Sequence, residues 1–488
     1  MNLVALNRLC VYTLLLVAML LSLCAITHAQ NTNQSMQQGQ DAWGAGVNNQ
    51  SNPDTQQARS SRTQRKKKKS QLDGRLSLRS FVSADQSETY PSPTVLINFL
   101  ETDLNAYNLT QSGLSLHLDA TFILDVSQSN ERRFGPTERF DQVRQLYLRH
   151  DLGRRFTLFF GRRLLHYAGN AWVDGLEIQT HLDRKRLHVG IYGGLSPDRF
   201  DRSLTVDYQA LGGYMDWQRK GFDFSLAMNT LLYQGSLDRT FAYQRTHIKI
   251  TDQLFFSDYL IVDLLDNVDV TTLLSTLDYT PTPAFNTAIT ISRYSLEQYR
   301  NQAIYRNIIE PNQALILGNE SINLVYHRLR FSASLQVTDD VYHYQMFEYK
   351  ARAQDGRTAH LYTIGVRHAN IFNSGVELDL QGQFMDQFRS DSLIVALSAY
   401  KDFSQYFTLD ARITHFKGRT LDQASDRVRI FDEAQNIYLM GLSLMYRATK
   451  SHRFILAYDA VYESELQDLK SDESLWIHTG MFKYSYLF

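Results

Sequence analysis

Residues 476–488 read WIHTGMFKYSYLF. In an extended strand, successive side chains point to opposite faces. One face then carries five aromatic side chains, those of Trp476, Phe482, Tyr484, Tyr486 and Phe488, and the other face is mixed. Aromatic rows of this kind are typical of strands that meet lipid at a membrane interface. The stretch therefore predicts a membrane strand, and an edge strand of a soluble β-sandwich is the alternative.

The same two-faced pattern recurs along the chain, most clearly in residues 114–126, 376–384, 407–414 and 453–462. One face of each is apolar and the other is polar. Charged side chains that face lipid cost up to a few kcal/mol each at the bilayer midplane, so we expect the polar faces to point into a wet interior. The predicted inward residues include His117, Asp119, His327, Glu377, Asp379, Asp410 and Arg412.

The spacing of the strands gives an independent indication of a barrel. Short links such as 219–221 and 373–375 alternate with longer ones such as 296–320, 346–357 and 417–435. Outer-membrane barrels alternate short inner turns with longer outer loops in this way. The pattern predicts an all-β fold, a single transmembrane antiparallel barrel over residues 72–488 with about 22 strands, in a range of roughly 16–22.

Residues 1–29 have the features of a secretory signal peptide, with Arg8 before an apolar run and Ala29 before the expected cleavage site. A lipoprotein site at Cys24 is the alternative. Both cysteines, Cys10 and Cys24, lie in this segment. We therefore expect an exported chain without disulfides or thiolate metal sites.

Residues 30–71 are rich in Gln, Asn and Ser and then in Lys and Arg, with a net charge of +5. Such a composition has little to bury and predicts a disordered periplasmic tail. Three roles stay open. The tail is a solubilising spacer, a periplasmic contact for a partner such as anionic polymer or lipid headgroups, or a plug that enters the pore. No nucleic acid is expected as a partner after export.

Catalytic and cofactor motifs are absent from the sequence. It contains no GxSxG, HExxH, phosphate-loop or dinucleotide-binding pattern. Acidic pairs such as Asp339-Asp340 and Asp472-Glu473 lack the spaced oxygen ligands of a calcium loop. We expect no enzyme activity, no cofactor and no metal.

One constellation stands apart from the strand pattern. Gly161-Arg162-Arg163 is followed by Tyr167-Ala168-Gly169-Asn170-Ala171-Trp172-Val173-Asp174-Gly175. This resembles the Gly-Arg-Gln … Gly … Asp-Gly stretch of alginate-export-type and related substrate porins, although Arg163 stands where that pattern has Gln. The resemblance implies a loop near the channel mouth and arginines that meet anionic solutes. Arg162 or Arg163 would point inward beside Arg149 and pair with Asp174 or with a passing anion. The alternative is a structural clamp, and in both cases Gly169 and Gly175 would allow the tight loop.

Residues 476–488 also resemble the C-terminal targeting strand of bacterial outer-membrane barrels. The resemblance implies that Phe482, Tyr484, Tyr486 and Phe488 are recognised by the barrel-assembly machinery. It implies a multi-pass protein of the bacterial outer membrane, in contact with outer-membrane lipid and lipopolysaccharide.

The leading functional hypothesis is a passive channel or export porin for a polar solute. The rival is a structural barrel that anchors an envelope or surface complex, and an outer-membrane hydrolase comes third. The residues before the first strand are too few for a globular plug. The interior is then open, closed by a partner, or closed by long loops such as 296–320 and 417–435.

Overall fold

The computed structural model describes most of the chain from residue 70 onward. The chain divides into two units, Met1–Leu72 and Asp73–Phe488. Residues 1–69 lie outside the described residues, and with them the predicted signal segment and nearly all of the predicted basic tail. The described residues are 70–86, 95–110, 113–125, 142–153, 155–182, 186–198, 202–265, 268–295, 325–353, 355–388, 390–420, 435–464 and 474–488.

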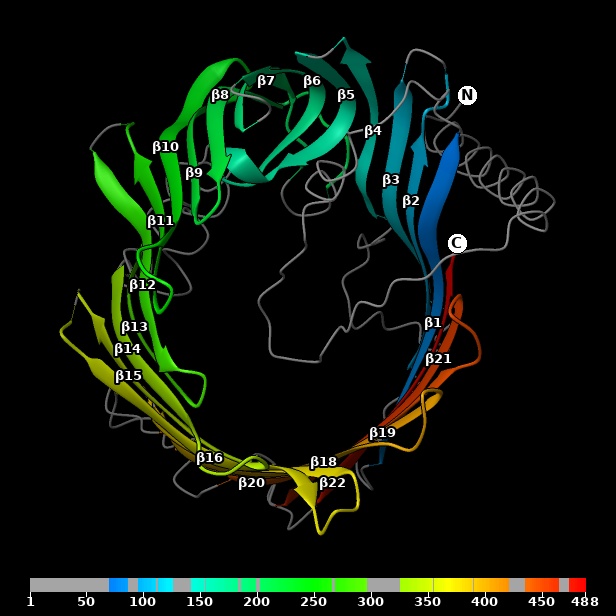
Figure 1. The fold of residues 1–488 in the computed structure, drawn as a ribbon, viewed down its shortest axis with the longest axis vertical. Helices are drawn as coiled ribbons and strands as arrows, with labels where there is room; N and C mark the ends of the chain where they lie inside the picture. Colours follow the sequence, from blue (N-terminus) through cyan, green and yellow to red (C-terminus); the bar gives the residue numbers. More distant parts are fainter. Residues whose placement is uncertain are drawn as a thin grey trace. The chain divides into compact units, whose positions relative to one another are not determined.

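The second unit is a closed β-barrel (Figure 1). Each of its 22 described strands pairs with the next one along the chain, and β1 pairs antiparallel with β22, from Arg75 opposite Leu487 to Gln86 opposite Trp476. The predicted fold class is confirmed, with the strand number at the upper end of the predicted range. The strands are β1 (Gln71–Gln86), β2 (Val95–Tyr107), β3 (Leu114–Asp125), β4 (Gln142–Leu152), β5 (Phe156–Leu165), β6 (Ala171–Leu182), β7 (Leu187–Leu195), β8 (Tyr208–Arg219), β9 (Phe222–Tyr233), β10 (Ser236–Lys249), β11 (Leu254–Asp263), β12 (Asp269–Thr282), β13 (Phe285–Ser295), β14 (Val325–Gln336), β15 (Val341–Arg352), β16 (Thr358–Ile371), β17 (Val376–Asp386), β18 (Ser390–Asp402), β19 (Phe407–Thr420), β20 (Gln435–Arg447), β21 (His452–Ser464) and β22 (Leu475–Leu487).

The links differ between the two ends of the barrel. At one end, the short-link end, they have two to six residues, as in 220–221 after β8 and 108–113 after β2. The other end, the long-link end, carries links of up to 29 residues, the longest being 296–324 after β13. The link 234–235 after β9 is also at this end, although it has only two residues. The predicted alternation of short and long links is therefore present over most of the chain.

The predicted long link from Met346 to Arg357 is wrong in extent. Strand β15 continues to Arg352 and leaves only 353–357 as the link. Glu348 and Lys350 look like loop residues in the sequence, but they alternate with Phe347 and Tyr349 and lie on the other face of the strand. A strand between lipid and a wet interior accommodates such an alternation without ending.

The strands are tilted, so a row of paired residues climbs from one end of the barrel to the other. The row begins at Asp223, beside the short link that precedes β9, and reaches Met385, next to the last residue of β17 at the long-link end. Strand tilt is a geometric requirement of closing a sheet into a barrel. Between its ends the row passes through His247, Ser257, Thr276, Thr290, Arg330, Glu348 and Leu361.

The outward face of the barrel is apolar. Large side chains on this face are exposed in every part of the wall, for example Leu124, Phe160, Ile191, Ile413 and Leu456, which are 56–65 % exposed. Soluble proteins rarely expose so much contiguous apolar surface, whereas a barrel in lipid requires it. The chain is therefore a transmembrane β-barrel of the bacterial outer-membrane type. No helix among the described residues is long and apolar enough to cross a bilayer.

Two bands of aromatic side chains border this apolar face on β19 to β22. Near the short-link end, the rings of Phe407, Tyr446, Phe454 and Tyr484 follow one another with centroids 4.5–6.1 Å apart. Near the long-link end, Tyr438, Tyr462 and Trp476 do the same, at 6.1 and 4.6 Å. Aromatic girdles at both membrane interfaces, on either side of an apolar band about 25 Å tall, are typical of outer-membrane barrels.

The aromatic stripe of β22 lies on the outward face. Phe482, Tyr484 and Tyr486 stand opposite Ser80, Leu78 and Leu76 of β1, and both leucines are exposed. On the other face of the seam, the hydroxyls of Ser77 and Ser485 form a buried hydrogen bond of 2.8 Å. The stripe is thus placed to meet lipid, and its recognition by the assembly machinery stays a prediction.

The assignment of the two faces predicts opposite outcomes for neighbouring residues of β20. Leu442 is in the middle of the outward face, whereas Ser443 points inward. We expect Leu442→Arg to lower the free energy of unfolding from bilayers by about 2–4 kcal/mol, because an arginine at the midplane faces hydrocarbon. The matched variant Ser443→Arg should lower the free energy of unfolding far less. Equal losses in a denaturant titration would contradict this assignment.

Candidate functional site

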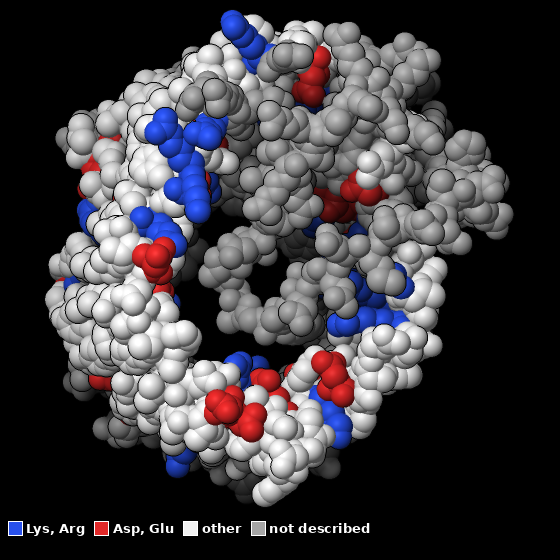
Figure 2. Space-filling view, in the orientation of Figure 1, with Lys and Arg blue, Asp and Glu red and all other residues white. Residues whose placement is uncertain are grey.

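The inward face of the wall carries many charged side chains. Around the central opening, Lys and Arg lie next to Asp and Glu, while much of the outer side is uncharged (Figure 2). Several pairs hold carboxylates in place, among them Arg79 with Glu101 at 3.2 Å and Lys483 with Glu101 at 2.9 Å. The polar faces identified in the sequence at residues 114–126, 376–384, 407–414 and 453–462 are all on this side.

The sequence-predicted residues of β3 and β4 make local ion pairs. The Asp119 carboxylate accepts hydrogen bonds from Arg144 Nε at 3.0 Å and from its Nη2 at 2.5 Å. Arg149 points inward opposite Phe159, and its Nε lies 3.2 Å from an oxygen of Asp151. Both pairs are partly exposed.

The structure also brings the predicted residues of β17 and β19 into two rows. Glu377 and Asp410 flank Tyr400 of β18, and Asp379 and Arg412 flank Ser398. Asp379 accepts a hydrogen bond of 2.7 Å from the Tyr344 hydroxyl, Glu377 is 3.6 Å from Arg367, and Arg412 donates to Thr414 at 3.1 Å. These four residues share the inward face, and their part in selectivity stays a prediction.

One expectation about side-chain direction is not met, and the structure decides between the two arginines. His327 was predicted to point inward, but it lies on the face of Leu329 and Phe331, which are exposed to the outside. Arg162 and Asp174 stand opposite each other on the face of Phe160 and Leu176, away from the interior. In both cases the alternation along the strand decides the direction, and a shift of one residue reverses it.

Arg162 acts as a clamp at the long-link end. Its guanidinium binds both carboxylate oxygens of Asp174 at 2.6 Å and donates to the carbonyl oxygens of Val143, at 3.0 Å, and Arg202, at 2.6 Å. Arg202 lies in the link between β7 and β8, and its guanidinium stacks on Trp172. The clamp therefore ties this link to β4, β5 and β6.

The link between β5 and β6, residues 166–170, folds into the barrel. It begins with a single 3-10 turn, His166–Ala168, and reverses direction at Gly169 and Asn170, which have φ values of 71° and 61°. A positive φ is readily adopted by Gly and is tolerated by Asn. We call residues 166–170 the inner loop.

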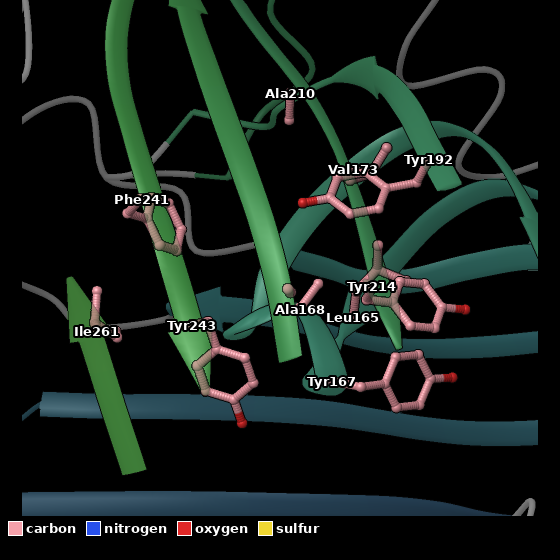
Figure 3. Packing of buried hydrophobic residues seen from close by; sticks show 11 residues of the cluster. Leu165, Tyr167, Ala168, Val173, Tyr192, Ala210, Tyr214, Phe241, Tyr243 and Ile261 are labelled. Carbon is pink, nitrogen blue, oxygen red and sulfur yellow. The ribbon is translucent and has the colours of Figure 1, made fainter. Parts of the chain in front are cut away.

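The inner loop packs on the inward face of strands that are distant in the sequence (Figure 3). Tyr167 lies against Tyr214 of β8, with ring centroids 4.8 Å apart, and Gly169 lies against the ring of Tyr243 of β10. A side chain at position 169 would approach that ring within 3.2 Å. The loop thereby forms part of a buried cluster with Leu165, Val173, Tyr192, Ala210, Ala227, Phe241 and Ile261.

Arg163 connects this cluster to a buried carboxylate. It is 7 % exposed, it forms an ion pair with Glu177, which is 4 % exposed, and its Nη2 donates to the Tyr167 hydroxyl at 2.7 Å. The Tyr214 hydroxyl donates to the other oxygen of Glu177. The Arg163 guanidinium also lies over the ring of Phe159 at 3.6 Å. Arg163 thus points inward as predicted for one of the two arginines, with Glu177 in place of Asp174 as its partner.

Glycines on the wall make room for the tyrosine rings. A Cβ atom at Gly190 would lie 2.4 Å from Tyr214 Cζ, and one at Gly212 would lie 2.5 Å from the Tyr192 hydroxyl. Gly175 serves a related purpose, because a Cβ there would meet the backbone of Gly194 at 2.7 Å. Gly169 has the turn role that the sequence predicted, whereas Gly175 permits close approach of β6 and β7.

A second inward cluster lies on β14 and β15, far along the wall from the inner loop. Glu348 is 1 % exposed and is surrounded by three cations. Arg330 contacts it at 2.7 Å, Lys350 at 3.0 Å and Arg328 at 3.6 Å. The three basic side chains are 30–41 % exposed, so the cluster presents cations to the interior and conceals the carboxylate. We call these four residues the basic cluster.

The basic cluster did not figure among the sequence-predicted site residues. The alternation of Arg328 and Arg330 with Leu329 and Phe331 is visible in the sequence and could have indicated an arginine-bearing inward face. Its meeting with Glu348 depends on the register of β14 on β15. Glu177 and Tyr214 were missed for the same reason, since three strands supply the parts of their network.

Comparison with known proteins adds only distant likenesses. No protein-family model matches the chain, and no curated protein does. Among solved structures it is similar to OccK11 (OpdR) of Pseudomonas aeruginosa, with 10 % identity, coverage of 86 % of this chain and 96 % of that one, and a TM-score of 0.39. It is similar to Pseudomonas aeruginosa OpdQ, with 8 % identity, 85 % and 99 % coverage and a TM-score of 0.40. It is also similar to Acinetobacter baumannii OccAB2, with 10 % identity, coverage of 86 % of this chain and 98 % of that one, and a TM-score of 0.39. The barrel assignment rests on this chain's own strand pairing.

The buried pair of Arg163 and Glu177 predicts a double-variant result. Arg163→Met leaves the Glu177 carboxylate buried without its cation, and we expect the free energy of unfolding to fall by about 3–5 kcal/mol. Adding Glu177→Gln removes the uncompensated charge and should recover at least about 1 kcal/mol. Denaturant titration of both variants measures this, and a double variant as unstable as the single one would contradict it.

The link 353–357 predicts a pH response outside the membrane-spanning strands. A hydrogen bond from the Arg352 guanidinium, with one from the Arg357 backbone N–H, lowers the pKa of Asp355 from 3.8 to about 2. Because the folded pKa is below the ordinary value, this contact is complete above pH about 4 and is lost as the pH falls toward 2. A carboxyl-carbon NMR titration should show this midpoint. A midpoint near 4 would mean that the contact does not form.

Proposed function

We propose that the barrel is a passive channel through the outer membrane for a polar solute, with a preference for anions. The observation that carries the proposal is the basic cluster on the inward face. Three cations share a single carboxylate there, which leaves a net charge of about +2 beside the path. The function requires no chemical step.

The position of these charges supports selectivity. The cationic side chains are partly exposed on the inward face, whereas Glu348 is buried behind them, so a passing ion meets positive charge first. Rings and patches of Arg and Lys favour anions in pores, because the low-dielectric wall strengthens their field. The pairs elsewhere on the inward face, such as Arg144 with Asp119 and Arg239 with Asp263, are closer to neutral.

A pair of variants at the basic cluster tests the proposal in opposite directions. Changing Arg328, Arg330 and Lys350 to Gln together with Glu348→Gln removes a net charge of +2 without leaving a buried carboxylate unpaired. We expect conductance in planar bilayers to persist and the anion-to-cation permeability ratio to fall. Glu348→Gln alone should raise that ratio.

The control is Lys401→Gln, which removes a cation from the outward face of β18. Its permeability ratio should equal that of the unaltered protein. An absence of conductance in all proteins would refute the channel. Conductance with an unchanged ratio in both cluster variants would refute the role of the basic cluster.

The same conductance measurement in planar bilayers also tests the predicted basic tail. Recordings with and without residues 30–71 separate a plug from the other two roles of the tail. A plug gives a larger or steadier current after deletion, whereas a spacer or a contact for a periplasmic partner leaves the current unchanged.

A further inference from the structure

The outward face of β11 carries a carboxylate at its centre. Its five outward side chains are, in order, Leu254, Phe256, Asp258, Leu260 and Val262. Asp258 therefore has two apolar residues on each side along the strand. It differs in this from the Arg162–Asp174 clamp, which lies near the long-link end. Ionisable groups at membrane depth are costly and usually mark a site with a function.

The neighbouring strands add polar groups beside this carboxylate. Thr246 of β10 and Ser275 of β12 stand directly opposite Asp258 in the sheet. Ser275 Oγ donates to one oxygen of Asp258, and Gln244 Nε2 donates to Thr246 Oγ1. Within the described residues, no hydrogen bond reaches the second oxygen of Asp258. We call Gln244, Thr246, Asp258 and Ser275 the outward polar patch, and Figure 1 shows its three strands side by side.

Apolar side chains surround the outward polar patch. Leu226 and Met228 of β9 lie on one side, and Leu277 and Ile291 of β12 and β13 lie on the other, all 41–54 % exposed. In a bilayer, polar side chains on a lipid-facing surface stabilise association by forming hydrogen bonds with polar groups of a neighbouring protein. Hydrocarbon offers no hydrogen-bond partner for this centre.

We propose that the outward polar patch is the centre of a contact with a second copy of this chain within the membrane. The patch contains an acceptor, the free oxygen of Asp258, and a donor, the remaining N–H of the Gln244 amide, on adjacent strands. A two-fold axis through the patch would place each carboxylate against the amide of the other copy. The patch is thus complementary to itself, and the proposal does not depend on the channel function.

Cysteine cross-linking tests the contact in the full chain. In a background with Cys10 and Cys24 changed to Ser, Leu260→Cys places one thiol next to the outward polar patch. The control, Leu456→Cys, places one on the outward face of β21, away from β11. In bilayers under mild oxidation we expect disulfide-linked dimers from Leu260→Cys and few from Leu456→Cys.

Variants of the carboxylate test the mechanism. Asp258→Leu should raise the dimer dissociation constant in bilayers about tenfold or more, because the central hydrogen bonds are lost. It should not lower the unfolding free energy of the monomer, since it removes a charge from the lipid-facing side. Asp258→Asn keeps an acceptor oxygen and should have a smaller effect on the dissociation constant.

Three results would overturn the proposal. One is equal cross-linking from the two cysteine positions. Another is a dimer whose dissociation constant does not change in Asp258→Leu. The third is cross-linking of Leu260→Cys to a different membrane protein or to none, which would assign the patch to another partner or to a purely local role in the sheet.

Discussion

The structure depends on one constraint, which is that backbone N–H and C=O groups cannot remain unpaired in hydrocarbon. The chain meets it by closing the sheet on itself. Twelve residues of β1 pair with β22, and Gly74 and Phe488 exchange backbone hydrogen bonds of 3.0 and 3.1 Å. An open sheet of the same strands would leave two long edges in lipid. The aromatic stripe of β22 and the buried Ser77–Ser485 bond lie at this seam.

Closure also divides the side chains into two environments, and the inner one is not uniform. From β5 to β11 the inner loop packs against tyrosines and small residues, with Arg163 and Glu177 buried among them. From β14 to β19 the inward side chains are mostly polar and partly exposed, and they include the basic cluster. One part of the wall is therefore built like a protein core, and the other like a solvated surface.

The fold could be predicted from the sequence because its main signal is local. A period of two over ten or more residues identifies a strand and its two faces, and the spacing of strands gives their approximate number. Contacts between strands could not be predicted in this way, because they depend on register. The choice between Arg162 and Arg163 illustrates this: the two are adjacent, and only the phase of β5 shows that Arg163 points inward.

The residues that the sequence analysis missed or misplaced have a related explanation, because their positions depend on where a strand ends, on its phase and on its register. Glu348 seemed part of a link because the stretch around it is rich in charge, although the alternation with Phe347 and Tyr349 continues. His327 was assigned to the wrong face near the start of β14, where the apolar pattern is weakest. The Tyr167–Tyr214 contact joins residues 47 positions apart in the sequence, and no local pattern reports it.

The tilt of the strands has a consequence for anything that moves through the interior. Residues that are neighbours across the sheet, from Asp223 to Met385, are at successive heights. The inward charges of neighbouring strands therefore lie on a helical path around the barrel wall and not at one height. A solute moving along the barrel axis would meet these residues one after another, and a substitution on one strand would alter the interior at one height only.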